Sequence, residues 1–276
     1  MAPSSNDVAR RHAAFLALHQ RPGAFVMPNP WDAGSARLLA SLGFEALATT
    51  SAGFAFSKGK RDSAAVLTRG DILANAHEIV AATELPVSAD LENGFGHAPE
   101  DCAASVREAA AIGLVGGSIE DASGDPAAPI YPFDEAVARV RAAADAVAGQ
   151  PFLLTARAEN FLWGRPDLED VIKRLRAFEA AGAHVLYAPG LPDLDAVRAV
   201  CAAVNRPVNV VIGLGSARWS VAELAAAGVR RVSVGGSLAR AAWGGLLRAA
   251  SELREQGTVG YADEAMSGAA IEALMD

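Results

Sequence analysis

The sequence has few cysteines, no excess of basic residues and no long apolar segment, and each shortage argues against a class of protein. Cys102 and Cys201 are its only cysteines, and both lie in alanine-rich helical patterns, where we expect buried small side chains rather than a disulfide or a catalytic thiol. The 24 basic and 32 acidic residues give a net charge of −8, which disfavours nucleic acid and anionic membranes as partners. No uncharged apolar run reaches the roughly 18 residues of a membrane span.

The amino-terminal segment also lacks the pattern of a secretory signal, because its arginines follow an acid and no long apolar core comes after them. We therefore expect a cytoplasmic protein. The 276 residues, 51% of them hydrophobic, suffice for one large domain, since α/β barrels often reach about 250 residues. No low-complexity linker divides the chain. We expect a single domain over residues 1–276, with 258–276 as a C-terminal helical tail.

Short apolar runs alternate with helical stretches along the whole chain. The runs that indicate strands are 24–28, 46–50, 85–90, 113–121, 151–157, 184–189, 207–213 and 231–236. The helical stretches between and after them are 33–42, 69–83, 99–112, 133–148, 168–181, 194–204, 220–227 and 238–256. Apolar runs without strict alternation are typical of strands buried on both faces of a parallel sheet. Eight such units predict an α/β fold, a closed (β/α)8 or TIM barrel, with an open doubly wound sheet as the alternative.

Two further helices are expected outside the eight units. One precedes the barrel at about residues 7–19, and a tail helix at about 261–275 follows the break "GTVG" at 257–260. A C-terminal helix of this kind is suited to pack against another subunit. We therefore expect a helical arm there.

Acidic and basic side chains gather where the expected strands end, which is where barrels of this type carry their chemistry. Asp90 and Glu92 follow the third strand, Glu120 the fourth and Arg157 the fifth. Clustered carboxylates are costly unless a cation neutralises them, and Mg²⁺ prefers oxygen ligands of this kind. The sequence predicts a Mg²⁺ site, with Mn²⁺ as the alternative ion, at Asp90, Glu92 and Glu120. Taken singly, each acid has a structural alternative: Asp90 and Glu92 as helix-capping or solvated loop acids, and Glu120 as the partner of an arginine.

Four stretches, in this order, resemble the isocitrate lyase/phosphoenolpyruvate mutase superfamily. They are "TTSAGFAFSKGKRD" (49–62), "PVSADLENGFG" (86–96), "GLVGGSIEDAS" (113–123) and "LTARAENF" (154–161). The resemblance covers nearly the whole chain. It implies a homo-oligomer, a dimer or a tetramer, in which the helix after the eighth strand is exchanged between subunits. It also implies Mg²⁺-dependent chemistry on 2-oxo acids or their enolates.

Carried over by position, the resemblance implies a role for each residue at the barrel mouth. Ser51, Ala52 and the backbone amide of Gly53 are expected to bind the substrate carboxylate, with Asp90 and Arg157 beside them. Asn209 is expected at the substrate from its place at the end of the seventh strand and not from the resemblance, and a structural role is its alternative. Asp90 is expected to be the nearest metal ligand, and Asp62, Glu92 and Glu120 to hold water molecules on the metal. Arg157, Asp62 and Glu120 are the residues expected to be catalytic.

The chain departs from the best-known members in the loop after the fourth strand. Isocitrate and methylisocitrate lyases carry a catalytic cysteine there, and phosphoenolpyruvate mutase a lysine and an asparagine, whereas this loop reads "DASGDPAAPIYPF". Pro189 stands at the end of the sixth strand, where those relatives have a histidine or a glutamate. What remains is an enolate-stabilising core with a loop that carries no basic residue and no cysteine.

These features predict a carbon–carbon lyase acting on a small 2-oxo or 2-hydroxy dicarboxylate through an enolate, of the oxaloacetate decarboxylase type. Three alternatives stay open at this point. They are a weak isocitrate or methylisocitrate lyase, a phosphoenolpyruvate or phosphonopyruvate enzyme, and a non-catalytic binder of 2-oxo acids.

Overall fold

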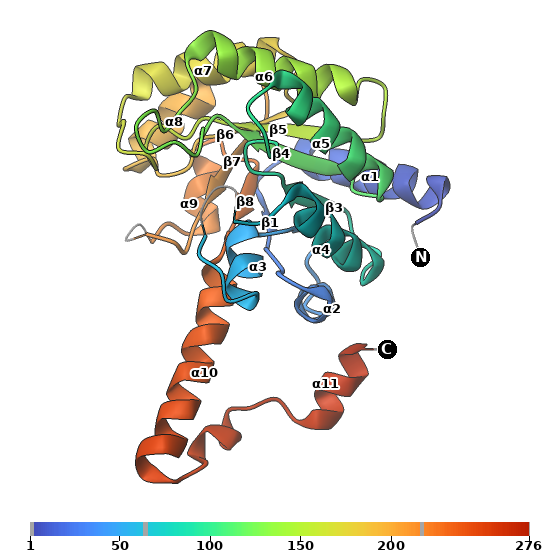
Figure 1. Ribbon diagram of the computed structural model, residues 1–276, viewed down its shortest axis with the longest axis vertical. Helices are drawn as coiled ribbons and strands as arrows, with labels where there is room; N and C mark the ends of the chain where they lie inside the picture. The colour runs from blue at the N-terminus through green and yellow to red at the C-terminus, as the bar shows by residue number, and fades with distance from the viewer. Residues whose placement is uncertain (1–2, 63–65, 216–217, 276) are drawn as a thin grey trace.

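Eight parallel strands, paired in the order β1-β8-β7-β6-β5-β4-β3-β2, form a nearly closed barrel (Figure 1). The strands are β1 (Phe25–Met27), β2 (Leu47–Ala48), β3 (Val87–Asp90), β4 (Gly116–Glu120), β5 (Leu153–Arg157), β6 (Val185–Tyr187), β7 (Val208–Val211) and β8 (Arg231–Ser233). At the seam between β1 and β2, the N–H of Ala48 donates to the carbonyl of Pro28 at 3.0 Å. The expected barrel is confirmed, and the doubly wound alternative is wrong.

The computed structural model describes residues 3–62, 66–215 and 218–275. Helices that follow the strands are α2 (Ala33–Ser41), α3 (Ser51–Ser57), α4 (Arg69–Ala81), α5 (Pro99–Ala111), α6 (Phe133–Ala146), α7 (Leu168–Ala180), α8 (Leu194–Ala203), α9 (Val221–Ala226) and α10 (Ser237–Gln256). The short helix α3 was not expected. It forms because the hydroxyl of Thr50 accepts a hydrogen bond from the N–H of Gly53 at 3.2 Å, which caps its first turn.

The helix α1 (Ser5–Gln20) lies beside the amino-terminal ends of several strands and confirms the helix expected before the barrel. Its Phe15 and Leu18 pack with Phe25, and all three are buried. Gly116 in β4 makes room for this packing, because a Cβ there would lie 2.9 Å from Cε1 of Phe15. The helix α1 therefore covers part of the amino-terminal end of the barrel.

The C-terminal part leaves the barrel as the long helix α10 and then turns back (Figure 1). It continues as a 3-10 turn, η1 (Gly260–Asp263), and ends in α11 (Gly268–Met275), which contacts α2. The expectation of one tail helix over 261–275 is wrong. Its break falls at Ser267, whose hydroxyl accepts a hydrogen bond from the N–H of Ala270 at 3.2 Å and starts a new helix.

No helix among residues 3–62, 66–215 and 218–275 is both long and apolar enough to cross a membrane. Both cysteines are free thiols, Cys102 buried and Cys201 partly buried, as expected. The extent of the single domain and the exchange of the helix after the eighth strand stay predictions.

The fold buries one histidine that resists protonation, and this predicts acid sensitivity. His19 is 5% exposed, and burial, with the charge of Arg231, lowers its pKa to about 3. The unfolded chain takes up a proton below pH 6.5 while the folded chain does not, so stability is lost as the pH falls below 6.5. We expect His19 to remove about 2 kcal/mol from the free energy of unfolding between pH 7.5 and pH 5. Urea unfolding at both pH values should show a weaker pH dependence in His19→Leu, and equal dependence would contradict this.

Candidate active site

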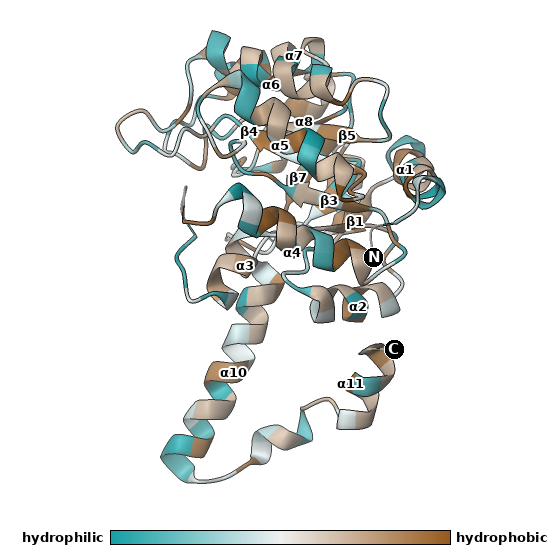
Figure 2. Ribbon diagram, turned by 45° about the vertical axis from the view of Figure 1, so that its right-hand side comes forward, coloured by the Kyte–Doolittle hydropathy of each residue, from teal (hydrophilic) through white to brown (hydrophobic). Residues whose placement is uncertain are grey.

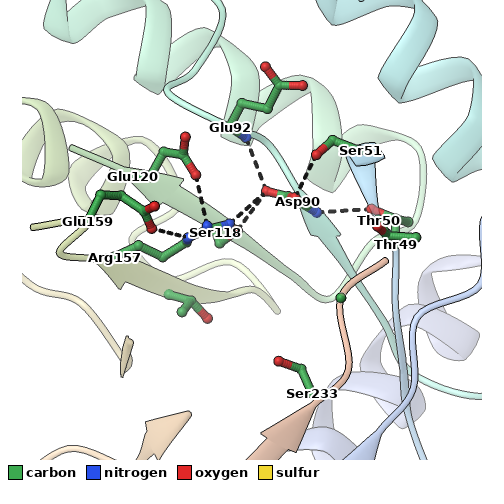
Figure 3. A network of polar contacts seen from close by, with 12 residues as sticks. Thr49, Thr50, Ser51, Asp90, Glu92, Ser118, Glu120, Arg157, Glu159 and Ser233 are labelled. Carbon is green, nitrogen blue, oxygen red and sulfur yellow. Dashed lines mark hydrogen bonds and ion pairs between the residues drawn. The ribbon is translucent and has the colours of Figure 1, made fainter. Parts of the chain in front are cut away.

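One arginine holds three carboxylates at the mouth of the barrel (Figure 3). Arg157 ends β5, and its Nη1 lies 3.1 Å from Asp90 Oδ1 at the end of β3. Its Nη2 lies 3.1 Å from Glu120 Oε2 at the end of β4, and its Nε donates to Glu159 Oε1 at 2.8 Å. The guanidinium and its partners are largely buried, so these contacts are weakly screened by solvent. The structure therefore brings Asp90, Glu120 and Arg157 together as the sequence predicts.

Asp90 is the most fully coordinated carboxylate of the site. Its Oδ2 accepts a hydrogen bond from the hydroxyl of Ser51 at 3.0 Å, and its Oδ1 accepts one from Ser118 at 3.4 Å. Its own N–H donates to the hydroxyl of Thr49 at 2.9 Å. The two hydroxyl donors fix the orientation of the carboxylate, and the contact with Thr49 fixes the backbone that carries it. Ser51, at the start of α3, is thus placed beside the expected metal ligand.

Glu92 lies two residues beyond Asp90 in an unusual backbone conformation. Its φ is 47°, in the left-handed region that residues with a Cβ seldom adopt. Burial and the charges of Asp90 and Asp62 raise its pKa to about 8, against the opposing effect of Arg157. The tight turn continues at Gly94, where a Cβ would lie 2.8 Å from Sγ of Cys102. Backbone strain and a carboxyl group that is costly to ionise thus coincide at the expected metal site.

The charges of the site are unbalanced towards the negative. Burial raises the pKa of Glu120 well above its ordinary value, and the carboxylates of Glu159, Asp90 and Glu92 add to this while Arg157 opposes it. Burial by itself lowers the pKa of Arg157, but the carboxylates of Glu120, Glu159 and Asp90 raise it well above its usual value. Arg157 therefore stays a cation, but one cation is too few to keep all of these buried carboxyl groups ionised. They tend to take up protons unless a second cation neutralises their charge.

A second buried ion pair supports the site from behind. Arg174 on α7 lies 2.9 Å from Oδ2 of Asp121, the residue after Glu120. Asp121 Oδ1 accepts the N–H of Glu159 at 2.8 Å. Burial raises the pKa of Asp121 to about 7, although the N–H of Glu159 and the charge of Arg174 lower it. Asp121 therefore ties the ends of β4 and β5 together and positions Glu159 against Arg157.

The remaining expected site residues occupy the edge and the interior of the mouth. Asp62 is exposed, but partial desolvation and the charge of Asp90 raise its pKa, so it lies within electrostatic reach of the cluster. Ala52 and Gly53 lie in the first turn of α3. Asn209 is buried in β7, where its Oδ1 accepts from Arg231 at 2.8 Å and its Nδ2 donates to Ser233 at 3.0 Å. Direct contact of these residues with a substrate stays a prediction.

The donor set fits a magnesium ion held directly by few protein ligands. Across the described parts of the chain, no three His, Cys, Asp or Glu side chains converge as a ready-made metal cage. Mg²⁺ does not require one, since it usually binds one or two carboxylates and keeps several water molecules. Asp90 fits a direct ligand because hydroxyl groups and Arg157 already orient both of its oxygens. Glu92 and Glu120 lie close enough to Asp90 for its charge to raise the pKa of each.

The sequence places Glu159 at the end of the fifth strand but assigns it no role, and Ser118 and Tyr187 were missed as parts of this cluster. Glu159 stands two residues after Arg157, a spacing that was visible, but its ion pair depends on the curve of the chain beyond β5. Ser118 points at Asp90 from the middle of β4. Tyr187 at the end of β6 has its ring centroid 4.9 Å from the guanidinium carbon of Arg157. In the sequence it resembles any other apolar strand residue.

Comparison with known proteins identifies the family. The sequence profile of phosphoenolpyruvate phosphomutase matches residues 15–254. The chain belongs to this family. It is therefore an enzyme of the isocitrate lyase/phosphoenolpyruvate mutase superfamily, whose lyases and mutases act on small carboxylates.

Three proteins similar to this chain illustrate the range of its relatives. A Burkholderia cenocepacia J2315 structure described in general terms as a lyase/mutase has 57% sequence identity and a TM-score of 0.95, over 98% of this chain and 96% of that one. An oxaloacetate decarboxylase from Paraburkholderia xenovorans (strain LB400) is 30% identical over 78% of this chain and 73% of its own. Oxaloacetate acetylhydrolase with its product oxalate has 26% identity and a TM-score of 0.87, over 98% and 94% of the two chains.

Removal of the buried ion pair between Arg174 and Asp121 should cause a large loss of stability. Arg174→Met leaves Asp121 buried without its cation, which should lower the free energy of unfolding by about 3–5 kcal/mol. The control is Arg198→Met, which breaks an ion pair whose side chains are 54% and 90% exposed. The control should cost less than about 1 kcal/mol. Denaturant unfolding measures the free energy of unfolding of both variants. Equal losses in Arg174→Met and Arg198→Met would contradict a larger contribution from the buried pair.

Proposed function

We propose that the protein is a Mg²⁺-dependent carbon–carbon lyase that acts on a small 2-oxo dicarboxylate through an enolate, as an oxaloacetate decarboxylase does. The observation that carries the proposal is the position of Arg157. Its guanidinium is fixed by Asp90, Glu120 and Glu159 at the mouth of the barrel, beside the best candidate for a metal ligand. Breaking a bond next to a carbonyl leaves a negative oxygen, and a preorganised cation beside that oxygen lowers the barrier.

In this mechanism the protein binds and orients a charged substrate. Ser51 and the start of α3 lie beside Asp90 and are placed to receive a substrate carboxylate. Arg157 faces the oxygen on which charge develops, while Glu159 and Asp121 hold it in place. When bound, Mg²⁺ supplies charge neutralisation and polarises the 2-oxo group. Glu92 and Glu120 complete the negative wall that favours the metal.

The loop after β4 favours decarboxylation over other reactions of the superfamily. Residues 121–133 contain no cysteine, lysine or histidine, so the loop offers no thiol acid and no cation for a phosphoryl group. Loss of CO₂ from oxaloacetate requires little beyond stabilisation of the enolate. Three oxaloacetate decarboxylases of 28% to 30% identity are among the relatives and support this choice.

The activity predicts a product that can be followed directly. Purified protein with Mg²⁺ should convert oxaloacetate to pyruvate and CO₂, and a proton NMR time course should show the pyruvate methyl signal. Asp90→Ala should reduce this turnover by about a hundredfold or more, because it removes the proposed metal ligand. Asp195→Ala, which changes an acid 90% exposed on α8, is the matched control and should retain full activity.

Other results of the same experiment would redirect the assignment. Isocitrate, methylisocitrate and phosphonopyruvate are tested in parallel, and consumption of one of them in place of oxaloacetate would name that reaction instead. Binding of 2-oxo acids without any turnover would mean a non-catalytic binder. Spontaneous decarboxylation by free Mg²⁺ is subtracted with the Asp90→Ala sample.

We propose further that the protein is a homo-oligomer, a dimer or a tetramer, and that α10 packs against a second copy. The helix projects from the barrel, and hydropathy colouring shows apolar residues along it (Figure 2). Of its twenty residues only Ala239 is buried, whereas Trp243, Leu246, Leu247 and Leu253 are 49% to 68% exposed. Exposed apolar patches of this kind mark interfaces.

We also propose a cytoplasmic location, which the two free thiols support.

The proposed interface predicts the mass of the protein in solution. Light scattering should give two or four times the chain mass of 28.4 kDa. The double change Leu246→Glu and Leu247→Glu should shift the protein towards the monomer, because it places charge in the apolar face. Leu42→Glu, at a site 67% exposed but away from α10, should leave the mass unchanged. A monomeric wild type would refute the interface.

A further inference from the structure

The proposed reaction needs a proton donor, and the usual positions do not provide one. Cleavage leaves an enolate whose carbon takes up a proton, but the loop after β4 has no cysteine, lysine or histidine. Cys102 is buried in α5, and burial raises its pKa to about 11. Cys201 lies at the end of α8 and also has its pKa raised to about 11 by burial. The thiol of Cys102 lies beneath the turn at Gly94 and donates to the carbonyl of Asn93 at 3.5 Å, so it is already engaged.

Tyr187 is placed where a donor is required. It is the last residue of β6 and pairs in register with Arg157 on β5 and with Asn209 on β7. Residues paired in this way on neighbouring parallel strands point to the same face, so the ring of Tyr187 shares the barrel interior with Arg157. The guanidinium carbon of Arg157 lies 4.9 Å from its ring centroid. One arginine thus touches both Asp90 and the tyrosine ring.

The hydroxyl of Tyr187 is also free to act. It makes no hydrogen bond with any of the described residues, and the side chain is only partly buried. The other hydroxyl groups nearby are engaged, since Ser51 and Ser118 donate to Asp90. The hydroxyl of Tyr131, the tyrosine in the loop after β4, is bonded to Nδ1 of His97 at 2.8 Å. Tyr187 is therefore the phenol with an uncommitted O–H beside the site.

A buried arginine provides the charge that a phenolate would need. Arg231 is 3% exposed and is held by Asn209 Oδ1 at 2.8 Å and by Thr155 Oγ1 at 3.0 Å, and its Nη1 has no hydrogen-bond partner. Burial raises the pKa of Tyr187, which keeps the phenol protonated at rest, while the charges of Arg157 and Arg231 lower it. The carboxylates of Glu159 and Asp90 act in the raising direction. The two arginines are thus the groups that favour the transient phenolate.

We propose that Tyr187 is the acid that protonates the enolate carbon. The inference rests on the proposed function. The phenolic O–H bond breaks, a C–H bond forms at C3 of the pyruvate enolate, and the electron pair of the O–H bond remains on the phenolate oxygen. Water then returns a proton to the phenolate, so no other reactant is consumed. In the reverse direction the phenolate removes a C3 proton from bound pyruvate.

The reverse step gives a direct test. Wild-type protein with Mg²⁺ should exchange the C3 protons of pyruvate for deuterium in D₂O, followed as loss of the methyl signal in proton NMR. Tyr187→Phe keeps the ring beneath Arg157 and removes only the hydroxyl, and should slow this exchange by about a hundredfold or more. Oxalate, a planar mimic of the enolate, should bind the variant with Mg²⁺ within about threefold of the wild-type affinity, since general acids act on the rate. Tyr131→Phe is the matched control and should retain wild-type exchange.

Each outcome decides the matter. Exchange in Tyr187→Phe as fast as in the wild type would overturn the assignment, as would loss of exchange in Tyr131→Phe alone. Loss of exchange together with loss of oxalate binding in Tyr187→Phe would mean that the tyrosine only binds the ligand. That result would also overturn its assignment as the acid. Failure of the proposed function looks different, because the wild type itself would then neither bind oxalate nor exchange pyruvate.

Discussion

The contact between Arg157 and three carboxylates is the interaction on which the site depends. Asp90, Glu120 and Glu159 come from the ends of three neighbouring strands, and the guanidinium is the cation that joins them. Without it, three acidic groups would be held in a partly dry environment, which costs several kcal/mol. The proposed Mg²⁺ would supply the further positive charge that lets these carboxyl groups ionise together.

The barrel supplies the rigidity that such a cluster needs. Parallel strands deliver Asp90, Glu120 and Arg157 to one edge, and α1 closes part of the opposite end with Phe15. Asp121 and Arg174 then lock two of the strand ends from behind. The cost of this arrangement appears as strain at Glu92 and as raised carboxyl pKa values. Such local violations of stability rules are expected where a protein binds or reacts.

The sequence predicts the barrel and the acidic edge well, because apolar runs and strand ends are local signals. The helix α3 escaped prediction since its seven residues are started by Thr50, which looks like the end of a strand. The break in the tail escaped because Ser267 gives only a weak capping signal. The ion network of Arg157 spans 67 residues to Asp90, and only the barrel register brings such positions into contact. The contact of Tyr187 with Arg157 could not be predicted for the same reason, since it depends on the pairing of β5 with β6.

Recognition of an enolate is the central claim, and calorimetric titration of oxalate tests it most directly. Oxalate presents two adjacent oxygens in a plane, as the enolate of pyruvate does, and cannot react. The account predicts that oxalate binds the wild type tightly with Mg²⁺ and at least about tenfold more weakly after Arg157→Gln, a loss of about 1.4 kcal/mol. Binding that is unchanged by removal of Mg²⁺ and by Arg157→Gln would contradict it, because the charge network would then have no part in recognising the ligand.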